Sequence, residues 1–260
     1  MKKLLFLILA TLIPASGLAG EIKTPESAQF YKNKIYVSNI GNLPPNRKDG
    51  DGFIAVLNGK GEFEKILSKG LNAPKGITFV KEKLYVTDID TVVAIDIKSG
   101  KVVKKIPIKE AKFLNDITAN KEALFVSDTQ TNTIFKIPLS TLKPEIFVKS
   151  YRLKGPNGLI FNKKGELICV SWNSGDVFKI SKEKIEKIGH INGNLDGIVI
   201  KEDGTLLISD FKNGRIYQLK NGKVKLLMKN LKTPADIGYN RGKLAIPEFF
   251  ADKVIIKKVD

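Results

Sequence analysis

The sequence predicts an all-β protein, a single six-bladed β-propeller, and three observations lead to that fold class. One motif recurs six times along the 260 residues. Short β-branched and aromatic runs alternate with turns rich in Gly, Asn, Asp and Lys, and no stretch keeps the apolar period of an amphipathic helix. A repeat of about 40 residues that contains several short strands is typical of propeller blades.

Each copy of the motif begins with Pro or Leu, followed by a variable residue, a small or polar residue and an apolar residue. A short loop then leads to an aliphatic strand that ends, in most copies, in Ser or Thr and an acidic residue. The copies begin blades one to six and occupy residues 25–28, 74–77, 114–117, 156–159, 195–198 and 234–237. Their variable positions are 49, 40, 42, 39 and 39 residues apart, and in a closed ring they form one circle around the axis.

Blade two has the clearest strand order. Its inner strand is predicted at 76–80, the second at 83–87, the third at 92–97 and the outer strand at 102–108. The first, third, fourth and fifth blades follow the same plan. Blade six has room for only two strands after its inner one, at 245–249 and 254–259. We expect residues 21–24 to supply the missing outer strand and to cover the open edge.

The first residues have the pattern of a secretory signal peptide. Lys2 and Lys3 precede an apolar run at 4–13, and small residues flank a leucine at 17–19. This pattern predicts a signal peptide at 1–19, and its apolar run is too short to span a bilayer. We expect residues 20–260 to form one exported domain, periplasmic or secreted, without a membrane span.

The charge is strongly positive. Without Lys2 and Lys3 the chain has 42 basic and 27 acidic residues, a formal charge of +15. The basic residues form no helical stripe and no aromatic-interleaved platform, so we interpret them as a solvated surface and expect no nucleic-acid partner. Cys169 lies alone in an apolar strand and is expected to be buried and inert. We expect a monomer whose partner is a small-molecule substrate or ligand at the channel mouth.

The circle of variable residues is the candidate site. Its members are Glu26, Lys75, Asn115, Asn157, Asp196 and Ala235. Two carboxylates and two amide carbonyls, with no imidazole or thiolate, suit Ca²⁺ best and Mg²⁺ or Mn²⁺ less well. The predicted metal ligands are therefore Glu26, Asn115, Asn157 and Asp196. The alternative is that these residues only form turns at strand ends, where Asn and Asp are common.

The motifs around these residues resemble the senescence-marker-protein/gluconolactonase superfamily of six-bladed propellers, and they are similar to the paraoxonase lactonases. The resemblance is carried by residues 25–27, 114–116, 156–158 and 195–197, and it extends from residue 21 to residue 260. In those families an early Glu, an Asn of a Pro-Asn-Gly-like motif and an Asp of an Asp-Gly-like motif hold the catalytic metal. The resemblance implies these roles for Glu26, Asn157 and Asp196, and a metal- or substrate-binding role for Asn115.

Two features depart from those families. Gluconolactonases have a sugar-contacting Arg two residues before the blade-three Asn, where this chain has Phe113. Paraoxonases have His residues near the metal, whereas the single histidine here, His190, is predicted on the outer strand of blade four. A Ser-His-Asp triad is excluded on the same ground. Gluconolactone is therefore not supported as the substrate.

The first functional hypothesis is a metal-dependent hydrolase of a lactone or related ester, in which the cation polarises the carbonyl group. Asp196 is the candidate general base. Lys75 is a candidate to orient an anionic substrate or to support the oxyanion, and the other interpretation is a salt bridge with Glu26 or a neighbouring Asp. Phe53 with the loop at 39–52 is a candidate lid. The candidate substrate-binding residues are Lys75, Asn115, Trp172 and Phe249.

Two alternatives remain open. A propeller that keeps the metal for rigidity and binds a ligand or partner without chemistry is favoured by Phe113 and by the long loop. A strictosidine-synthase-like propeller would use Glu248 as its acid without a metal, and the intact oxygen circle argues against it. Asp88, Asp128 and Asp210, which close second strands, are expected to accept hydrogen bonds from turn amides.

Overall fold

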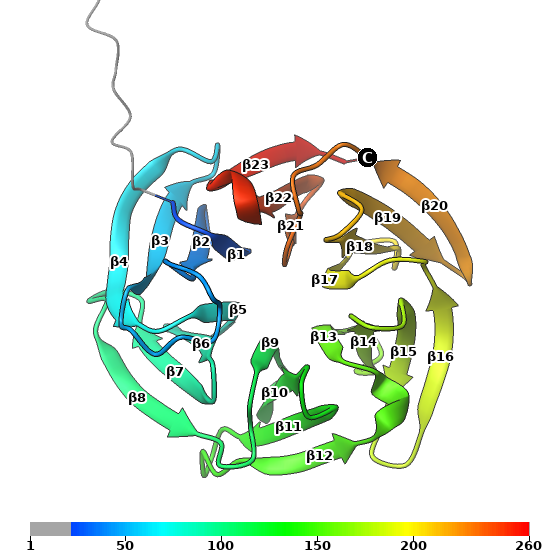
Figure 1. The fold of residues 1–260 in the computed structure, drawn as a ribbon, viewed down its shortest axis with the longest axis horizontal. Coiled ribbons are helices and arrows are strands. Elements are labelled where there is room, and N and C mark those ends of the chain that lie inside the picture. The colour runs from blue at the N-terminus through cyan, green and yellow to red at the C-terminus, as the bar shows by residue number, and fades with distance from the viewer. Residues whose placement is uncertain (1–21, 260) are drawn as a thin grey trace, which may run out of the picture.

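The computed structural model describes residues 22–259, so the predicted signal peptide lies outside the described residues. Residues 22–259 form six antiparallel sheets arranged around a central axis like blades (Figure 1). The predicted all-β, six-bladed propeller is confirmed. Within the described range, no helix is long and apolar enough to cross a membrane.

The first five blades each have four strands, ordered from the axis to the rim. Blade one contains β1 (Pro25–Tyr31), β2 (Lys34–Asn39), β3 (Gly52–Asn58) and β4 (Phe63–Leu71). Blade two contains β5 (Pro74–Val80), β6 (Lys83–Asp88), β7 (Thr91–Asp96) and β8 (Val102–Pro107). Blade three contains β9 (Leu114–Ala119), β10 (Ala123–Asp128), β11 (Thr133–Pro138) and β12 (Glu145–Lys149).

The remaining blades follow the same order. Blade four contains β13 (Pro156–Phe161), β14 (Leu167–Ser171), β15 (Asp176–Ile180) and β16 (Ile185–His190). Blade five contains β17 (Leu195–Ile200), β18 (Leu206–Asp210), β19 (Arg215–Lys220) and β20 (Lys223–Met228). Blade six contains β21 (Gly238–Asn240), β22 (Lys243–Glu248) and β23 (Lys253–Lys258). Two short 3-10 helices connect strands: η1 (Tyr151–Leu153) lies between β12 and β13, and η2 (Phe249–Ala251) lies between β22 and β23.

The described part of the predicted closing strand, residues 22–24, does not form the outer strand of blade six, whose sheet has three strands. The Lys23 amide donates to Asn39 Oδ1, and Thr24 O accepts from the Ile40 amide, so this segment lies against the end of β2. Pro25 starts the inner strand directly afterwards. Three residues reach at most ~10 Å, whereas a fourth strand lies ~14 Å outside the inner one.

The ring instead closes through the inner strands of blades six and one. The Asp236 amide donates to Glu26 O at 2.8 Å, and the Ala28 amide donates to Asp236 O at 3.2 Å. An apolar cluster between the same two blades contains Ala28 and Ala245. Phe53 belongs to this cluster and is only 9% exposed. The prediction that Phe53 forms part of a lid is therefore wrong, because its ring is committed to the core.

A β-bulge interrupts the inner strand at the variable position in each of blades one to five. In blade one, Pro25 pairs with Asn39 and Ser27 with Ser38, which leaves Glu26 outside the ladder. A bulge turns its side chain away from the regular pleat. The repeated bulge thus gives the variable residues of successive blades the same orientation relative to the axis.

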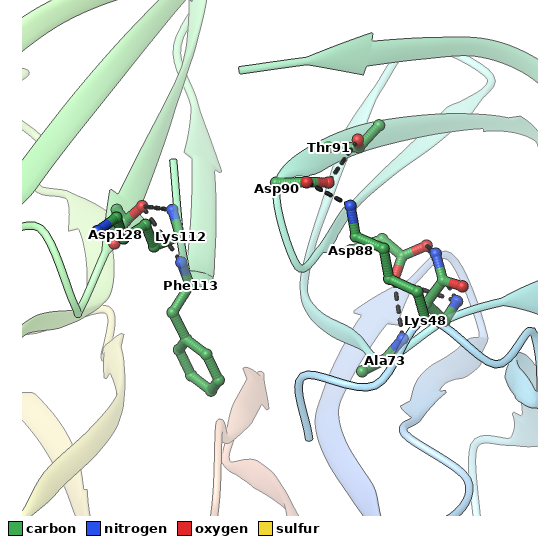
Figure 2. A network of polar contacts seen from close by, with 9 residues as sticks. Lys48, Ala73, Asp88, Asp90, Thr91, Lys112, Phe113 and Asp128 are labelled. Carbon is green, nitrogen blue, oxygen red and sulfur yellow. Dashed lines mark hydrogen bonds and ion pairs between the residues drawn. The ribbon is translucent and has the colours of Figure 1, made fainter. Parts of the chain in front are cut away.

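The acids that close the second strands bind turn amides, as the sequence predicts. Asp88 accepts from the Ala73 amide at 2.8 Å, and Asp128 accepts from the Lys112 and Phe113 amides at 2.6 and 3.3 Å (Figure 2). Asp210 accepts from the Asn194 amide. These bonds satisfy amides that would otherwise be buried without partners. They also fix the chain just before each variable residue.

Candidate functional site

A cavity of about 350 Å³, here named the axial cavity, lies at the end of the propeller where inner strands start and second strands end. Its deep part is polar and buried, and its mouth is apolar. The polar lining consists of Glu26, Lys75, Asn115, Thr129 and Asp196. The apolar lining consists of Ile40, Leu43, Pro45, Phe113, Trp172, Phe211, Phe249 and Phe250.

The structure brings most of the predicted site residues to this one cavity. Glu26, Asp196, Lys75, Asn115, Trp172 and Phe249 all line it. Asn157 is only 1% exposed and is not part of the lining. It is buried close to Asp196. The predicted circle is therefore a spatial cluster, and the roles of its members stay predictions.

Three polar side-chain atoms in this cluster are buried without a hydrogen-bond partner: Glu26 Oε2, Asp196 Oδ1 and Asn157 Nδ2. Leaving such atoms unsatisfied costs about 1–3 kcal/mol each, and more for charged groups. The two carboxylate oxygens share one cluster at the bottom of a cavity. A cation bound between them would satisfy both.

The amide of Asn115 is oriented by Thr129 of the same blade, which is itself bonded to the next blade. Its Nδ2 donates to Thr129 Oγ1 at 3.1 Å, and Thr129 Oγ1 donates to Pro156 O at 2.9 Å. Because the amide nitrogen is occupied, Oδ1 remains available as an acceptor or ligand. Thr129 was not singled out by the sequence analysis, although it follows the acid Asp128 at the end of a second strand.

The donor set fits a hard divalent cation. Glu26 and Asp196 supply oxygens without partners, Asn115 supplies a free carbonyl oxygen, and rotation of the Asn157 amide exchanges its nitrogen for its oxygen. Among the described residues, no three His, Cys, Asp or Glu side chains are grouped so as to hold a metal ion. The predicted ligand set has only two carboxylates, so a metal ion bound there would also need the amide oxygens of Asn115 and Asn157.

Burial and mutual repulsion shift the pKa values of the acids in this cluster. Burial raises the pKa of Glu26 well above its ordinary value, the charges of Asp196 and Asp236 raise it further, and Lys75 opposes them. The pKa of Asp196 is also raised well above its ordinary value, first by burial and then by Asp236. Both carboxyl groups therefore retain a proton to higher pH than exposed acids do, unless a cation replaces it.

Two further acids, Asp116 and Asp236, belong to the same electrostatic cluster and received no role in the sequence analysis. Each is the third residue of its motif and is 4% exposed. Asp116 accepts from the Leu159 and Ile117 amides, and Asp236 accepts from Ser27 Oγ and Gln29 Nε2. Burial raises the pKa of Asp236 to about 6. The sequence could have pointed to these two acids, because the third motif position holds Gly or Ser in the other four blades and a carboxylate only here.

Glycines in neighbouring blades make room for these two acids. A Cβ on Gly76 would lie 2.5 Å from Asp116 Cα, and a Cβ on Gly197 would lie 2.7 Å from Asp236 Cα. Real Cβ atoms do not approach other atoms so closely. Gly76 and Gly197 therefore each lie against the Asp of the next blade. A side chain at either glycine would collide with the backbone of that Asp.

Lys75 is the cation of the circle and is only 1% exposed. Its Nζ donates to Pro45 O at 2.9 Å and to Ala73 O at 3.0 Å. Burial lowers its pKa to about 8, although Glu26 and Asp88 act in the opposite direction. Within the described chain Lys75 forms no ion pair with Glu26 or with a neighbouring Asp. The alternative interpretation of a direct salt bridge is therefore not supported.

Four aromatic rings form one side of the cavity. Phe211 lies at the centre, 5.4 Å from Trp172, 5.4 Å from Phe249 and 6.0 Å from Phe250 between ring centroids. Phe250 is 64% exposed and marks the mouth. Phe211 was missed, although it follows the acid of its second strand just as Phe249 does.

The loop at 39–52 reaches over the cavity and is tied down at three places. Leu43 and Pro45 line the cavity, and Pro45 O accepts the bond from Lys75. Lys48 pairs with Asp90 at the turn of blade two (Figure 2). The Asn42 amide donates to Asp51 at 2.8 Å. These bonds hold the loop over the axial cavity, where it narrows the entrance to the cavity.

The residues that other catalytic hypotheses would need lie away from the axial cavity or already form hydrogen bonds and ion pairs. His190 is on β16, the outer strand of blade four, where Nδ1 lies 2.9 Å from Asp176. Glu248 Oε1 accepts from the Lys232 amide, and Oε2 pairs with Lys253. Cys169 is buried, and burial raises the pKa of its thiol. The predicted outer position of His190 and the predicted burial of Cys169 are both confirmed.

No family model matches the chain, and no curated protein matches its sequence. Solved structures do resemble the fold. A catalytically inactive histidine variant of virginiamycin B lyase from Staphylococcus aureus with quinupristin has 17% identity and a TM-score of 0.66, over 94% of this chain and 97% of that chain. A protein of unknown function from Bacteroides thetaiotaomicron has 16% identity and a TM-score of 0.70, over 91% and 70%.

The nidogen/laminin complex gives a third match, with 15% identity and a TM-score of 0.66, over 90% of this chain and 88% of that chain. At these identities the likeness shows the fold alone. The matched proteins include a lyase and a component of a protein complex, so the same fold accompanies different functions. The chain is a six-bladed β-propeller of the kind found in these proteins.

Proposed function

We propose that the protein is a metal-dependent hydrolase that opens a lactone or a related ester in the axial cavity. The observation that carries the proposal is the pair of unpartnered, buried oxygens, Glu26 Oε2 and Asp196 Oδ1, at the bottom of a cavity with apolar walls. Glu26, Asn115, Asn157 and Asp196 would hold Ca²⁺, or Mg²⁺ or Mn²⁺ in its place. The cation supplies Lewis-acid polarisation of the substrate carbonyl.

The side chains would divide the remaining work. Asp196 accepts a proton from the attacking water, because its carboxylate lies at the bottom of the cavity where it can contact both the cation and the water. The ester C–O bond breaks, and the alcohol oxygen takes that proton as the acid product forms. Trp172 and Phe249 hold the apolar part of the substrate and exclude water, which strengthens electrostatic interactions in the cavity.

The test uses purified protein that begins at residue 20. Elemental analysis identifies the resident metal, and a panel of lactones and aryl esters is assayed with and without EDTA and added Ca²⁺. Metal-stimulated hydrolysis that Asp196→Ala abolishes supports the proposal. Absence of metal-stimulated turnover across the panel, with a folded protein, overturns it.

A second candidate is a non-catalytic propeller that binds a ligand or partner and uses the metal for rigidity. The favouring observation is that Lys75 is held by two backbone carbonyls and faces Phe113, so it is not free to contact a substrate in the closed loop conformation. The same assays separate the two functions, because this candidate binds Ca²⁺ without turnover.

The virginiamycin B lyase match does not lead to a third candidate. The solved variant of that enzyme is inactive after replacement of a histidine. The only histidine of this chain, His190, lies on the outer strand β16, away from the axial cavity. A reaction that depends on a histidine at the axis is therefore not proposed here.

A further inference from the structure

We propose that the axial cavity selects an amphipathic anion, a small molecule with an aromatic or aliphatic body and a negatively charged group at one end. The inference deepens the proposed function, because the same cavity would hold the ester. It rests on two independent features, an apolar wall and a ring of unpaired lysines around the mouth.

The ring of lysines follows from the repeat. The position two residues before each motif holds lysine in four of the six blades. We name these residues the lysine collar: Lys23, Lys112, Lys154 and Lys232. The other two blades have Asn72 and Gly193 there.

Equivalent backbone bonds hold the collar residues. The amides of Lys23, Lys112 and Lys232 donate to Asn39 Oδ1, Asp128 Oδ2 and Glu248 Oε1, which are the side chains that close the second strands. Ser171, in the same place in blade four, bonds Lys154 O instead. The four residues therefore occupy matching places around the end of the propeller that contains the cavity.

The collar charges are not neutralised within the described chain. All four residues are exposed, and none forms an ion pair with another described residue. Nearby Lys48 and Lys253, in contrast, are paired with Asp90 and Glu248. The unpaired ammonium groups give the mouth a positive potential that attracts anions.

Three collar residues adjoin the apolar wall. Lys112 directly precedes Phe113, which lines the cavity. The Trp172 amide donates to the carbonyl of Gly155, the residue after Lys154. Lys232 lines a shallow hollow of about 550 Å³ together with Phe250, which also lines the axial cavity. A ligand body on the wall thus places its end within reach of a collar lysine.

Charge and depth determine the orientation of the ligand. Glu26 and Asp196 at the bottom offer no positive charge to a negative group, whereas the collar attracts such a group to the mouth. The wall between them offers rings and few hydrogen-bond donors, so a hydroxyl-rich sugar gains little there. The ligand therefore binds with its neutral end inward and its charged end at the collar.

The test compares two fluorescent probes with the same aromatic body, anilinonaphthalenesulfonate, which is anionic, and phenylnaphthylamine, which is neutral. We expect tighter binding of the sulfonate, with a Kd that rises with salt, while the Kd of the neutral probe changes little. The triple variant Lys112→Gln, Lys154→Gln, Lys232→Gln should raise the sulfonate Kd by about tenfold at low ionic strength and leave the neutral probe unaffected.

A matched triple variant, Lys104→Gln, Lys182→Gln, Lys225→Gln, removes the same charge from exposed sites away from the mouth and should have little effect. Phe211→Ala, and separately the exposed Phe250→Ala, should weaken both probes and so locate them at the wall. Equal affinity for the two probes, an equal effect of the matched triple, or insensitivity to both Phe variants overturns the inference. Probe binding needs no turnover, so an inactive protein would overturn only the proposed hydrolysis.

Discussion

The ammonium group of Lys75 lies 4.4 Å from the centre of the Phe113 ring, and these two residues come from neighbouring blades. The negative face of an aromatic ring attracts a cation, and more strongly when both are desolvated. Phe113 stands where gluconolactonases have an Arg. An Arg in that place would bring a second cation close to the buried Lys75, so the Phe ring suits the neighbouring ammonium group better.

Lys75 predicts a specific dependence of stability on pH. Its folded pKa of about 8 is below the ordinary 10.5, so the unfolded chain binds more protons between these values and stability rises with pH there. The free energy of unfolding of the wild type, relative to Lys75→Met, should rise by about 2 kcal/mol between pH 8 and pH 10. Urea unfolding of both proteins across this range measures it, and a constant difference would contradict the assigned cause.

Asp236 predicts the opposite sign at acidic pH. Its folded pKa of about 6 exceeds the ordinary 3.8, so the folded protein binds more protons and stability falls as pH rises from 4 to 6. In EDTA, Asp236→Asn should remove about 2 kcal/mol of this fall in the free energy of unfolding between pH 4 and pH 6. Urea midpoints at pH 4, 5, 6 and 7 give the slope.

Asp203→Asn is the control for that experiment. Asp203 is exposed and pairs with Lys220, which holds the pKa of Asp203 below its ordinary value. Its contribution is therefore present at neutral pH and is lost on acidification. If both variants change the pH slope in the same direction, the assignment to buried carboxylates is wrong.

The steric coupling between Gly76 and Asp116 predicts a large effect of one methyl group. Gly76→Ala would place Cβ 2.5 Å from Asp116 Cα, a backbone atom that cannot move aside cheaply. We expect the free energy of unfolding to fall by about 3 kcal/mol. Gly59→Ala is the matched control, because its Cβ would lie 3.3 Å from the nearest atom, Asn33 O. Similar urea midpoints for the two variants would refute the coupling.

The blade boundaries were predictable because each inner strand starts with the same motif. The predicted strands of blade two, at 76–80, 83–87, 92–97 and 102–108, match β5 to β8 within two residues at each end. The place of residues 22–24 was not predictable, because their partners, Asn39, Ile40 and Asp252, are distant in sequence and carry no pattern.

The polar part of the cavity was predictable for a similar reason. A repeat position becomes a circle in space, so oxygen donors such as Glu26 and Asp196 meet although 170 residues separate them. The aromatic wall was only partly predictable. Ser171 pairs with the first residue of its motif, as Asp210 and Glu248 do in their blades. Trp172, Phe211 and Phe249 each follow these residues directly, but the Ser in place of an acid hides the equivalence in the sequence.

The proposed hydrolysis predicts that Asp196→Asn separates metal binding from turnover. The amide oxygen of Asn can still ligate a cation, but it cannot accept a proton from water at neutral pH. We expect calorimetry to show Ca²⁺ affinity within about tenfold of the wild type, whereas Asp196→Ala should lose most binding. Hydrolysis by Asp196→Asn should fall by about 10²–10⁴-fold.

The exposed acid variant Asp203→Asn, which lies outside the axial cavity, should retain both properties. Loss of turnover in proportion to loss of metal would make Asp196 a ligand only, and another group would have to take the proton. Unchanged turnover in Asp196→Asn would remove Asp196 from the chemistry altogether. Retained affinity with lost turnover is expected, because Asp196 Oδ1 is buried without a hydrogen-bond partner and its side chain lines the axial cavity, where the water would bind.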